Sequence, residues 1–201
     1  MIQPVVTQVH LPAGVAGPNA MDFDVRCFLV PHATGVTIVD TGMDHSVPLI
    51  AEKLAEIGGD WGDVTDVILT HDHPDHTGGL AQVIERAPAA AVWAGADDIF
   101  PVAVAAAHEG DMIRGLRVVA TPGHTAGHLS LLATDDDVLL IGDLAGNQNG
   151  QVVRAPEAFT ADPAQAEQSL HRVALLDFAD MYPSHGAPAD RQALHRLLGN
   201  R

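Results

Sequence analysis

The amino-acid sequence predicts a layered α/β fold. Short runs rich in valine, isoleucine and leucine alternate along the chain with segments whose apolar residues recur every three or four positions. The first pattern is typical of strands, and the second is typical of helices that cover a sheet with one face. The chain has 201 residues, 47% of them hydrophobic, which is enough for one domain with a sizeable core. We therefore expect a single domain over residues 1–201, with sheets inside and helices outside.

The N-terminal third predicts strands followed by a helix. Strands are expected over residues 5–10, 25–30 and 36–39. The last two are joined across 32–35, whose threonine and glycine suit a hairpin turn. Ile50, Leu54 and Ile57 then recur at helical spacing, and the two glycines that follow them are a typical end of a helix.

Three further helices are expected later in the chain, over residues 80–87, 163–176 and 189–198. The first of these would place His76 near its N-terminus. The second has a strong start signal, because Asp162 is a capping acid, Pro163 suits the first helical position and Gln165 follows three residues after the cap.

The most informative stretch of the chain is His-Asp-His-Pro-Asp-His at residues 71–76, which directly follows the apolar run 67–69. It places three imidazoles and two carboxylates within six residues at the end of a strand. Neutral imidazole and carboxylate are ligands of Zn²⁺ and similar ions, and two interleaved sets of ligands can serve two ions. A solvated polar loop is the plain alternative, but it gives histidines and acids no reason to alternate. The stretch therefore predicts a metal site.

Four other polar segments also follow runs that read as strands. They are residues 40–42, 121–128, 142–143 and 184–186. Side chains on loops at one edge of a sheet are held by rigid strands, so such a group forms a preorganised site.

Taken in order, these five segments resemble the motif series of the metallo-β-lactamase fold superfamily, from about Val25 to His185. The resemblance implies a four-layer αββα sandwich of the metallo-β-lactamase type, with two divalent metal ions at one rim. Zinc is the first expectation, and iron or manganese also suits mixed histidine and aspartate ligands. By this resemblance His71, His73 and His124 hold one ion, Asp75, His76 and His185 hold the second, and Asp143 bridges the two.

The resemblance also implies roles for the neighbours of these ligands. Asp40 matches the family's first acid, which orients a ligand histidine through the ring nitrogen that faces away from the metal. His128 is the last residue of the third segment and is expected to support the site without binding an ion. Asp75 can serve the reaction as well as the metal, by orienting water or by passing its proton to the leaving group.

This ligand set predicts a metal-dependent hydrolase. Two ions that share Asp143 also share a water, whose pKa falls from ~16 toward ~7, so that a metal-bound hydroxide is the nucleophile. One ion polarises the substrate carbonyl while the other accepts an alkoxide or thiolate leaving group. We therefore expect hydrolysis of a small ester, lactone or thioester.

Comparison with named subfamilies narrows this expectation. The catalytic segment is most similar to glyoxalase II, a hydroxyacylglutathione hydrolase, but without its glutathione-binding C-terminal domain, because only 186–201 follow the last ligand. β-Lactamases of this fold usually carry cysteine or serine where Asp143 stands. Acyl-homoserine-lactone lactonases place a tyrosine shortly after that aspartate, whereas 144–147 contains none.

Three alternatives remain open. A mononuclear iron persulfide dioxygenase of the same fold can retain every one of these ligands. A β-lactamase is less expected for the reasons just given. A non-catalytic metal-binding protein is also less expected, because it would have lost one or more ligands.

Composition argues against nucleic acid and membranes as partners, and the resemblance implies a small-molecule substrate. A formal net charge of −16 with ten Lys and Arg leaves no basic footprint for nucleic acid or for an anionic membrane. No window reaches the length of a membrane span, and residues 1–6 lack a secretory signal, so the expected compartment is the cytoplasm.

Cys27, the sole cysteine, predicts a buried thiol in a strand. Loops at 11–24 and 144–160 are expected to set specificity, while the substrate and the oligomeric state are not specified.

Overall fold

The computed structural model describes residues 1–15 and 17–199, and it contains two six-stranded sheets. The first sheet has the order β1-β2-β3-β4-β5-β6. Its strands are β1 (Gln3–Leu11), β2 (Met21–His32), β3 (Gly35–Val39), β4 (Val64–Leu69), β5 (Ala91–Gly95) and β6 (Ala105–Ala107). Strands β1 to β3 are antiparallel neighbours, and β3 to β6 run parallel, so the sheet is mixed.

The second sheet has the order β14-β13-β10-β9-β8-β7. Its strands are β7 (Met112–Ile113), β8 (Leu116–Ala120), β9 (Leu129–Ala133), β10 (Val138–Gly142), β13 (Asp180–Pro183) and β14 (Ala189–Asp190). A separate hairpin consists of β11 (Ala145–Gln148) and β12 (Gln151–Arg154). The helices are α1 (Val47–Glu56), α2 (Pro74–Thr77), α3 (Leu80–Arg86), α4 (Pro163–Val173) and α5 (Arg191–Leu197), with short 3-10 turns at Asp44–Ser46, Trp61–Asp63 and Glu157–Phe159.

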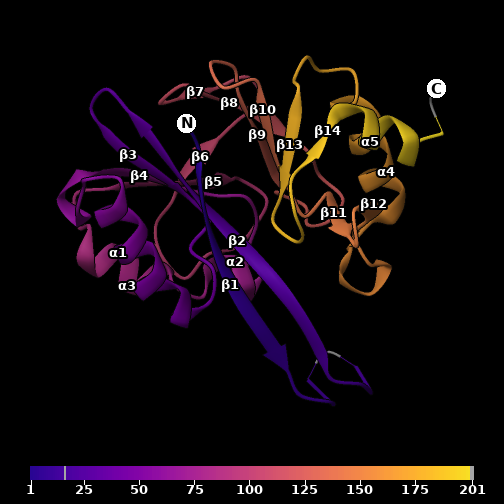
Figure 1. The fold of residues 1–201 in the computed structure, drawn as a ribbon, viewed down its shortest axis with the longest axis horizontal. Coiled ribbons are helices and arrows are strands. Elements are labelled where there is room, and N and C mark those ends of the chain that lie inside the picture. Colours follow the sequence, from indigo (N-terminus) through magenta and orange to yellow (C-terminus); the bar gives the residue numbers. More distant parts are fainter. Residues whose placement is uncertain (16, 200–201) are drawn as a thin grey trace.

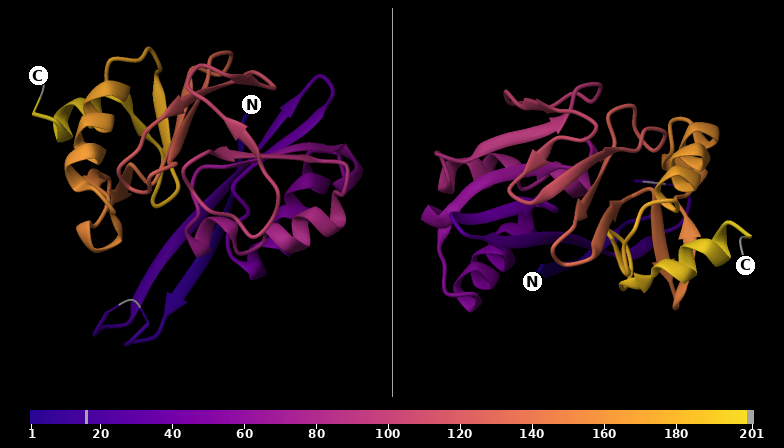
Figure 2. Two further views of the ribbon diagram at one scale, coloured as in Figure 1. Left: turned by 180° about the vertical axis from the view of Figure 1, so that it is seen from behind. Right: turned by 90° about the horizontal axis from the view of Figure 1, so that it is seen from above.

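Four layers follow from the three hydrophobic clusters of the protein. One cluster packs α1 and α3 on the outer face of the first sheet, with Leu29 and Leu54 among its members. A second fills the space between the sheets, and a third packs α4 and α5 on the outer face of the second sheet. Figures 1 and 2 show these two helix pairs on opposite outer faces. The predicted αββα sandwich is therefore confirmed.

Strand β2 shows how the sequence creates two of these interfaces at once. Cys27 and Leu29 belong to the cluster under α1, whereas Phe28 and Val30 belong to the cluster between the sheets. Successive side chains of a strand point to opposite faces, so a continuous apolar run is required where both faces are covered. The buried position of Cys27 is as predicted.

Most of the expected elements are confirmed. The hairpin of β2 and β3 pairs His32 with Gly35. Helix α4 begins as predicted, with Pro163 in its first turn and the Asp162 carboxylate accepting a hydrogen bond from the backbone N–H of Gln165 at 2.9 Å.

Two expectations about helix starts are wrong. The last helix begins at Arg191, because Ala189 and Asp190 pair with β13 as the short strand β14, and the Asp190 side chain caps the helix. His76 lies in the separate one-turn helix α2, which Gly78 and Gly79 divide from α3.

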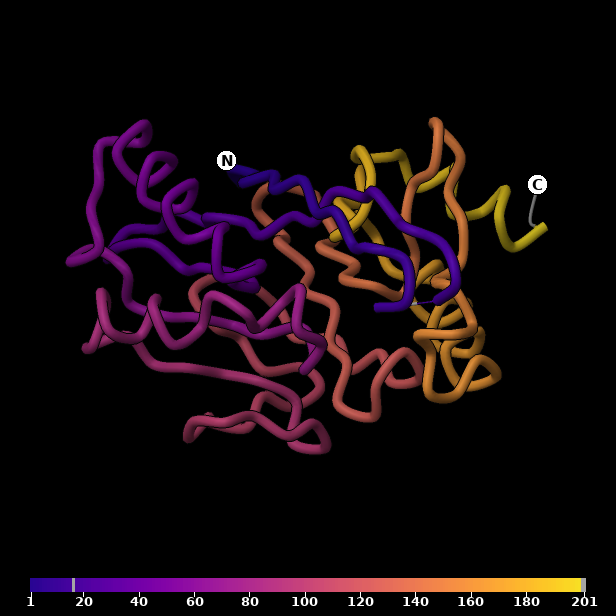
Figure 3. The backbone as a smooth tube through the Cα atoms, turned by 90° about the horizontal axis from the view of Figure 1, so that it is seen from below, coloured from indigo at the N-terminus to yellow at the C-terminus, as the bar shows by residue number. Residues whose placement is uncertain are grey.

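Both of the expected specificity loops include residues of a strand hairpin. Residues 11–24 form the end of the long β1–β2 hairpin, which pairs Leu11 with Met21, and residue 16 itself lies outside the described residues. This hairpin projects from the first sheet and crosses toward the second (Figures 1 and 3), where the N–H of Arg26 donates to the carbonyl of Ser184 at 2.8 Å. Residues 144–160 contain the β11–β12 hairpin and a 3-10 turn. Within residues 1–15 and 17–199, no helix combines the length and apolarity needed to cross a bilayer.

Candidate metal centre

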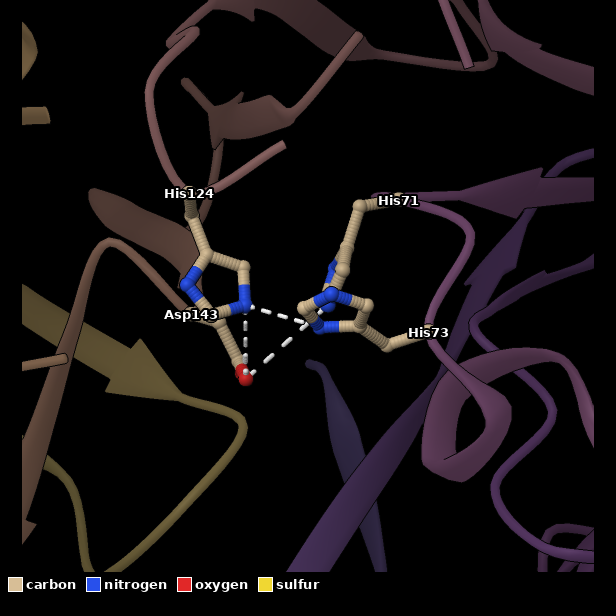
Figure 4. A group of neighbouring side chains, drawn as sticks. All are labelled: His71, His73, His124 and Asp143. Atoms are coloured by element: carbon tan, nitrogen blue, oxygen red, sulfur yellow. Dashed lines mark hydrogen bonds and ion pairs between the residues drawn. The ribbon is translucent and has the colours of Figure 1, made fainter. Parts of the chain in front are cut away.

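Four of the expected ligands meet where strands of the two sheets end (Figure 4). His71 and His73 follow β4, His124 follows β8 and Asp143 follows β10. One potential ligand atom from each of the four lies within 4.8 Å of the others. The Nε2 atom of His124 is 3.0 Å from Nδ1 of His73 and 3.5 Å from Oδ2 of Asp143. The first predicted ligand set is therefore brought together, and we call these four residues the first group.

The other three expected ligands form a second group, which consists of Asp75, His76 and His185, again with ligand atoms within 4.8 Å of one another. Asp143 lies between the two groups. Its Oδ1 is 3.4 Å from Nε2 of His76, and its Oδ2 is 3.1 Å from Nε2 of His185 and 3.9 Å from Nε2 of His71. One carboxylate thus faces both groups, which is the geometry required of a bridging ligand.

The residues present fit divalent cations. Nε2 of His71, Nε2 of His76 and Oδ1 of Asp143 are all buried, and none of them has a hydrogen-bond partner among the described residues. A buried polar atom without a partner is costly, so native proteins satisfy such atoms with a hydrogen bond, water or an ion. Imidazole nitrogen and carboxylate oxygen are ligands of zinc and similar metals.

A buried network fixes the ring orientation of two histidines. The Asp40 carboxylate accepts hydrogen bonds from the N–H of Thr70 at 2.7 Å and from its hydroxyl at 2.8 Å. It also lies 2.9 Å from Nδ1 of His76, and the Thr70 oxygen lies 3.0 Å from Nδ1 of His71. Because the Thr70 hydroxyl gives its proton to Asp40, its oxygen accepts from Nδ1 of His71. The Asp40 carboxylate likewise accepts from Nδ1 of His76. The Nε2 lone pairs of both histidines are therefore free to face a metal, as expected for Asp40.

His128 supports the bridging carboxylate without joining either group. Its Nε2 accepts a hydrogen bond from the backbone N–H of Asp143 at 3.1 Å. Its Nδ1 therefore carries the proton and donates to the Thr121 hydroxyl at 2.8 Å. That hydroxyl lies 3.0 Å from Ser130, which in turn donates to the carbonyl of Ile141 at 3.1 Å. Each group in this series therefore donates a hydrogen bond to the next, from the Asp143 N–H to the Ile141 carbonyl. Both ring nitrogens of His128 are used in the series, so neither is free to bind a metal.

His185 is oriented from strand β2. Its Nδ1 lies 2.7 Å from the backbone carbonyl of Asp24, so Nδ1 donates and Nε2 faces Asp143. The Asp24 side chain accepts a hydrogen bond from the N–H of Gly186 at 3.1 Å and pairs with Arg26. Arg26 also donates to the carbonyl of Gly186. Two neighbouring side chains of β2 therefore hold the loop that carries His185.

The electrostatics separate the histidines into two classes. Burial holds the pKa of His71 well below 6.5 and lowers the pKa of His124 to about 4, so both rings are neutral at pH 7. Burial would also lower the pKa of His185, but the charge of Asp143 outweighs it and raises that pKa to about 10. Burial would raise the pKa of Asp143, yet His76 and His185 hold it well below 3.8. Without metal, the acid is balanced by protonated imidazole, which a cation can replace.

Several residues of this centre are missing from the sequence-based set. Thr70 and Thr121 have a weak signal, because each is a polar residue directly at the end of a strand-like run. Asp24 has no such signal, since it lies 161 residues from His185 and reaches it through a backbone carbonyl.

Comparison with known proteins agrees with this geometry. The family model of the Metallo-beta-lactamase superfamily matches residues 20–104 and 95–185. Hydroxyacylglutathione hydrolase of Ectopseudomonas mendocina (strain ymp) is 34% identical over 161 residues, which are 77% of this chain and 58% of that protein. Thioesterase pkgB of Emericella nidulans is 33% identical over 175 residues, 84% of this chain and 48% of that protein. The chain thus spans less than two thirds of the length of either relative.

Solved structures share the architecture. A metallo-beta-lactamase family protein from Thermus thermophilus superposes with a TM-score of 0.72 over 97% of this chain and 78% of that chain, at 22% identity. At this identity the likeness shows the fold alone. The family model, in contrast, extends over every position from His71 to His185. On that match, the chain belongs to the metallo-beta-lactamase superfamily.

Proposed function

We propose that this chain is a dinuclear metal-dependent hydrolase of a small ester, lactone or thioester. The observation that carries the proposal is the position of Asp143, whose two oxygens lie 3.4 Å from His76 and 3.1 Å from His185 while the same carboxylate belongs to the first group. His71, His73 and His124 would hold one ion, and Asp75, His76 and His185 the other. Divalent ions there, with zinc the first expectation, supply Lewis acidity that polarises a carbonyl and lowers the pKa of water.

The side chains of the site have distinct tasks in this proposal. The buried hydrogen bonds of Asp40 and Thr70 keep His71 and His76 in one tautomer, so that ligand geometry is preorganised. Asp75 is the more exposed of the two central acids, with 20% of its side chain accessible compared with 9% for Asp143. Asp75 can therefore exchange a proton with solvent, and we assign to it the orientation of water and proton transfer to the leaving group.

A thioester is favoured among the three substrate classes. Both curated relatives described above carry names of thioester chemistry, hydroxyacylglutathione hydrolase and thioesterase. No covalent nucleophile is needed from the chain, and burial raises the pKa of the Cys27 thiol, which keeps it protonated and unreactive. We also propose that the chain acts as one domain on a small-molecule substrate.

The competing reaction is the iron-dependent oxidation of a persulfide. That reaction uses a single iron, whereas His76 and His185 both lie within 3.4 Å of Asp143 and offer ligands for a second ion. Because such a dioxygenase can retain these ligands, the measured reaction has to distinguish the two proposals. The test is an assay of metal-quantified protein against thioesters, lactones and β-lactams, with oxygen consumption measured in parallel on a persulfide.

We expect thioester or lactone hydrolysis that chelator removes and Zn²⁺ or Mn²⁺ restores. His185→Ala should abolish most of that activity, and Asp177→Asn, an exposed acid outside the site, should not change it. Protein that is inert toward every ester and consumes oxygen with iron would contradict the proposal.

A further inference from the structure

Residues 95–99, which begin with the last residue of β5, lie against both histidine loops of the first group. The Asp98 carboxylate accepts a hydrogen bond from the Thr125 hydroxyl at 2.6 Å and another from the backbone N–H of Gly127 at 2.6 Å. Thr125 directly follows His124 in the chain. The two hydrogen bonds therefore hold the turn that sets the direction of the His124 ring.

The next residue reaches the other histidine loop. The N–H of Ile99 donates to the Asp72 carboxylate at 3.4 Å, and Asp72 lies between His71 and His73 in the chain. Two successive residues, Asp98 and Ile99, thus connect the loops that carry three of the four members of the first group.

Segment 95–99 approaches the His124 loop closely, and the approach is closest at two glycines. A Cβ atom on Gly95 would clash with the carbonyl oxygen of Gly127, and a Cβ atom on Gly127 would lie 2.6 Å from the N atom of Asp98. Both positions therefore need glycine, since no larger residue fits at this approach. The fit places the Asp98 carboxylate against the turn at a fixed distance.

The opposite side of the same turn is anchored to the start of α4. The N–H of Asp162 donates to the carbonyl of Gly123 at 2.8 Å, and the N–H of Ala161 donates to the carbonyl of His124 at 3.0 Å. The Thr160 hydroxyl on this side also lies 3.4 Å from Nδ1 of His124. The His124 loop is thus held from both sides, and Asp98 supplies side-chain hydrogen bonds on one of them.

We propose that Asp98 is a positioning residue of the first metal group, which keeps Nε2 of His124 at its 3.0 Å approach to Nδ1 of His73. The inference rests on the proposed function only in that the first group binds a metal, and it is independent of the substrate. Loss of a residue that orients a metal ligand lowers metal affinity by roughly 10- to 100-fold. Because the side-chain hydrogen bonds of Asp98 go to Thr125 and Gly127, and none of them reaches Asp75, His76 or His185 in the described structure, the effect should be confined to the first group.

A matched residue exists for the second group. Asp24 supports the His185 loop through the N–H of Gly186, as described above, and it makes no contact with the His124 loop among the described hydrogen bonds. Asp98→Ala should therefore lower the affinity for the ion of the first group, and Asp24→Ala the affinity for the ion of the second. General destabilisation of the fold would lower the affinity for both ions in either variant.

The experiment is stepwise Zn²⁺ titration of chelator-treated protein by calorimetry. His124→Ala and His185→Ala identify which binding phase belongs to which group. Asp98→Ala should weaken the phase that His124→Ala removes by roughly 10- to 100-fold and leave the other unchanged. Asp98→Asn should retain most of the affinity, because its amide accepts from Gly127 and donates to Thr125. Thr125→Val, which removes one hydrogen bond, should show a smaller loss in the same phase.

Several outcomes would overturn the inference. One is that Asp98→Ala lowers the Zn²⁺ affinity of both phases equally, and another is that it lowers neither. A third is that Asp98→Asn loses as much affinity as Asp98→Ala. Urea unfolding checks that the metal-free variants fold, with the exposed acid variant Asp177→Asn as the control. If Asp98→Ala does not fold, the Zn²⁺ affinities of Asp98→Asn and Thr125→Val test the inference instead. Wild-type protein that binds metal but hydrolyses nothing would refute the proposed function and leave this inference standing. Absence of any phase that His124→Ala removes would refute both.

Discussion

The carboxylate of Asp40 lies 2.9 Å from Nδ1 of His76, and both side chains are sealed from solvent. Asp40 directly follows β3 and has a φ of 57°, a left-handed backbone conformation that aspartate tolerates better than most residues. This conformation turns the side chain toward the end of the adjacent strand β4, where it also receives two hydrogen bonds from Thr70. The end of one strand thereby sets the orientation of ligands on the next.

Asp40→Ala should weaken metal binding or activity by roughly 10- to 100-fold, because His76 loses the partner that fixes its tautomer. His73→Ala should abolish activity, since it removes a ligand. Competition with a chelator of known affinity measures the first effect and a hydrolysis assay the second. Complete loss of metal in both variants would mean that Asp40 is itself a ligand.

His128→Ala should destabilise the protein by about 1–3 kcal/mol, because it leaves the N–H of Asp143 and the hydroxyl of Thr121 buried without their partner. Urea unfolding of the metal-free protein checks this value. His128→Gln, whose side-chain oxygen can accept from the Asp143 N–H, should lose less. An unchanged free energy of unfolding in His128→Ala would show that water replaces the ring.

The metal-free protein should be most stable near pH 6.5, the usual pKa of histidine. Burial lowers the pKa of His124 to about 4 and of His128 to about 3, so below pH 6.5 the unfolded chain binds more protons and stability falls toward pH 4. The pKa of His185 is raised to about 10, since Asp143 outweighs the opposing effect of burial. The contribution of protonated His185 to the free energy of unfolding is therefore complete below pH 6.5 and is lost as the pH rises toward 10.

Urea unfolding of chelator-treated protein across this range measures the pH profile. Stability that rises steadily from about pH 5 to pH 9 would contradict the charged pair of His185 and Asp143.

Asp162→Ala should cost about 0.5–2 kcal/mol of stability, the usual cost of removing an N-terminal cap, here of α4. Asp162→Ser retains a capping oxygen and should lose less. Thermal unfolding of both variants tests this. A loss of metal in Asp162→Ala beyond its effect on stability would indicate that α4 also sets the His124 loop through this side chain.

The candidate ligand positions could be brought out from sequence because histidines and aspartates at strand ends stand out, as polar residues that directly follow apolar runs. Residues 71–76 and Asp143 are of this kind, and the structure brings them together. The layers could be predicted because residues 27–30 form a continuous apolar run, which places apolar side chains on both faces of the strand and indicates that both faces are covered.

The supporting contacts could not be predicted, because they join residues that are far apart in the chain. Asp98 and Thr125 are 27 residues apart, and Asp24 and Gly186 are 162 apart. The expected start of the last helix, at residue 189, was wrong because strand pairing of Ala189 with Met181 overrides the local helical pattern. The short strands β6, β7, β11 and β12 span two to four residues each, too few for a periodic signal.

The central claim is that Asp143 serves two ions at once, and metal content per chain tests it most directly. Protein reconstituted with Zn²⁺ and freed of excess metal should contain two ions per chain. His124→Ala and His185→Ala should each lose one ion, whereas Asp143→Ala should weaken the binding of both, since its carboxylate faces both groups. One ion per chain in the wild type, unchanged in Asp143→Ala, would contradict the account.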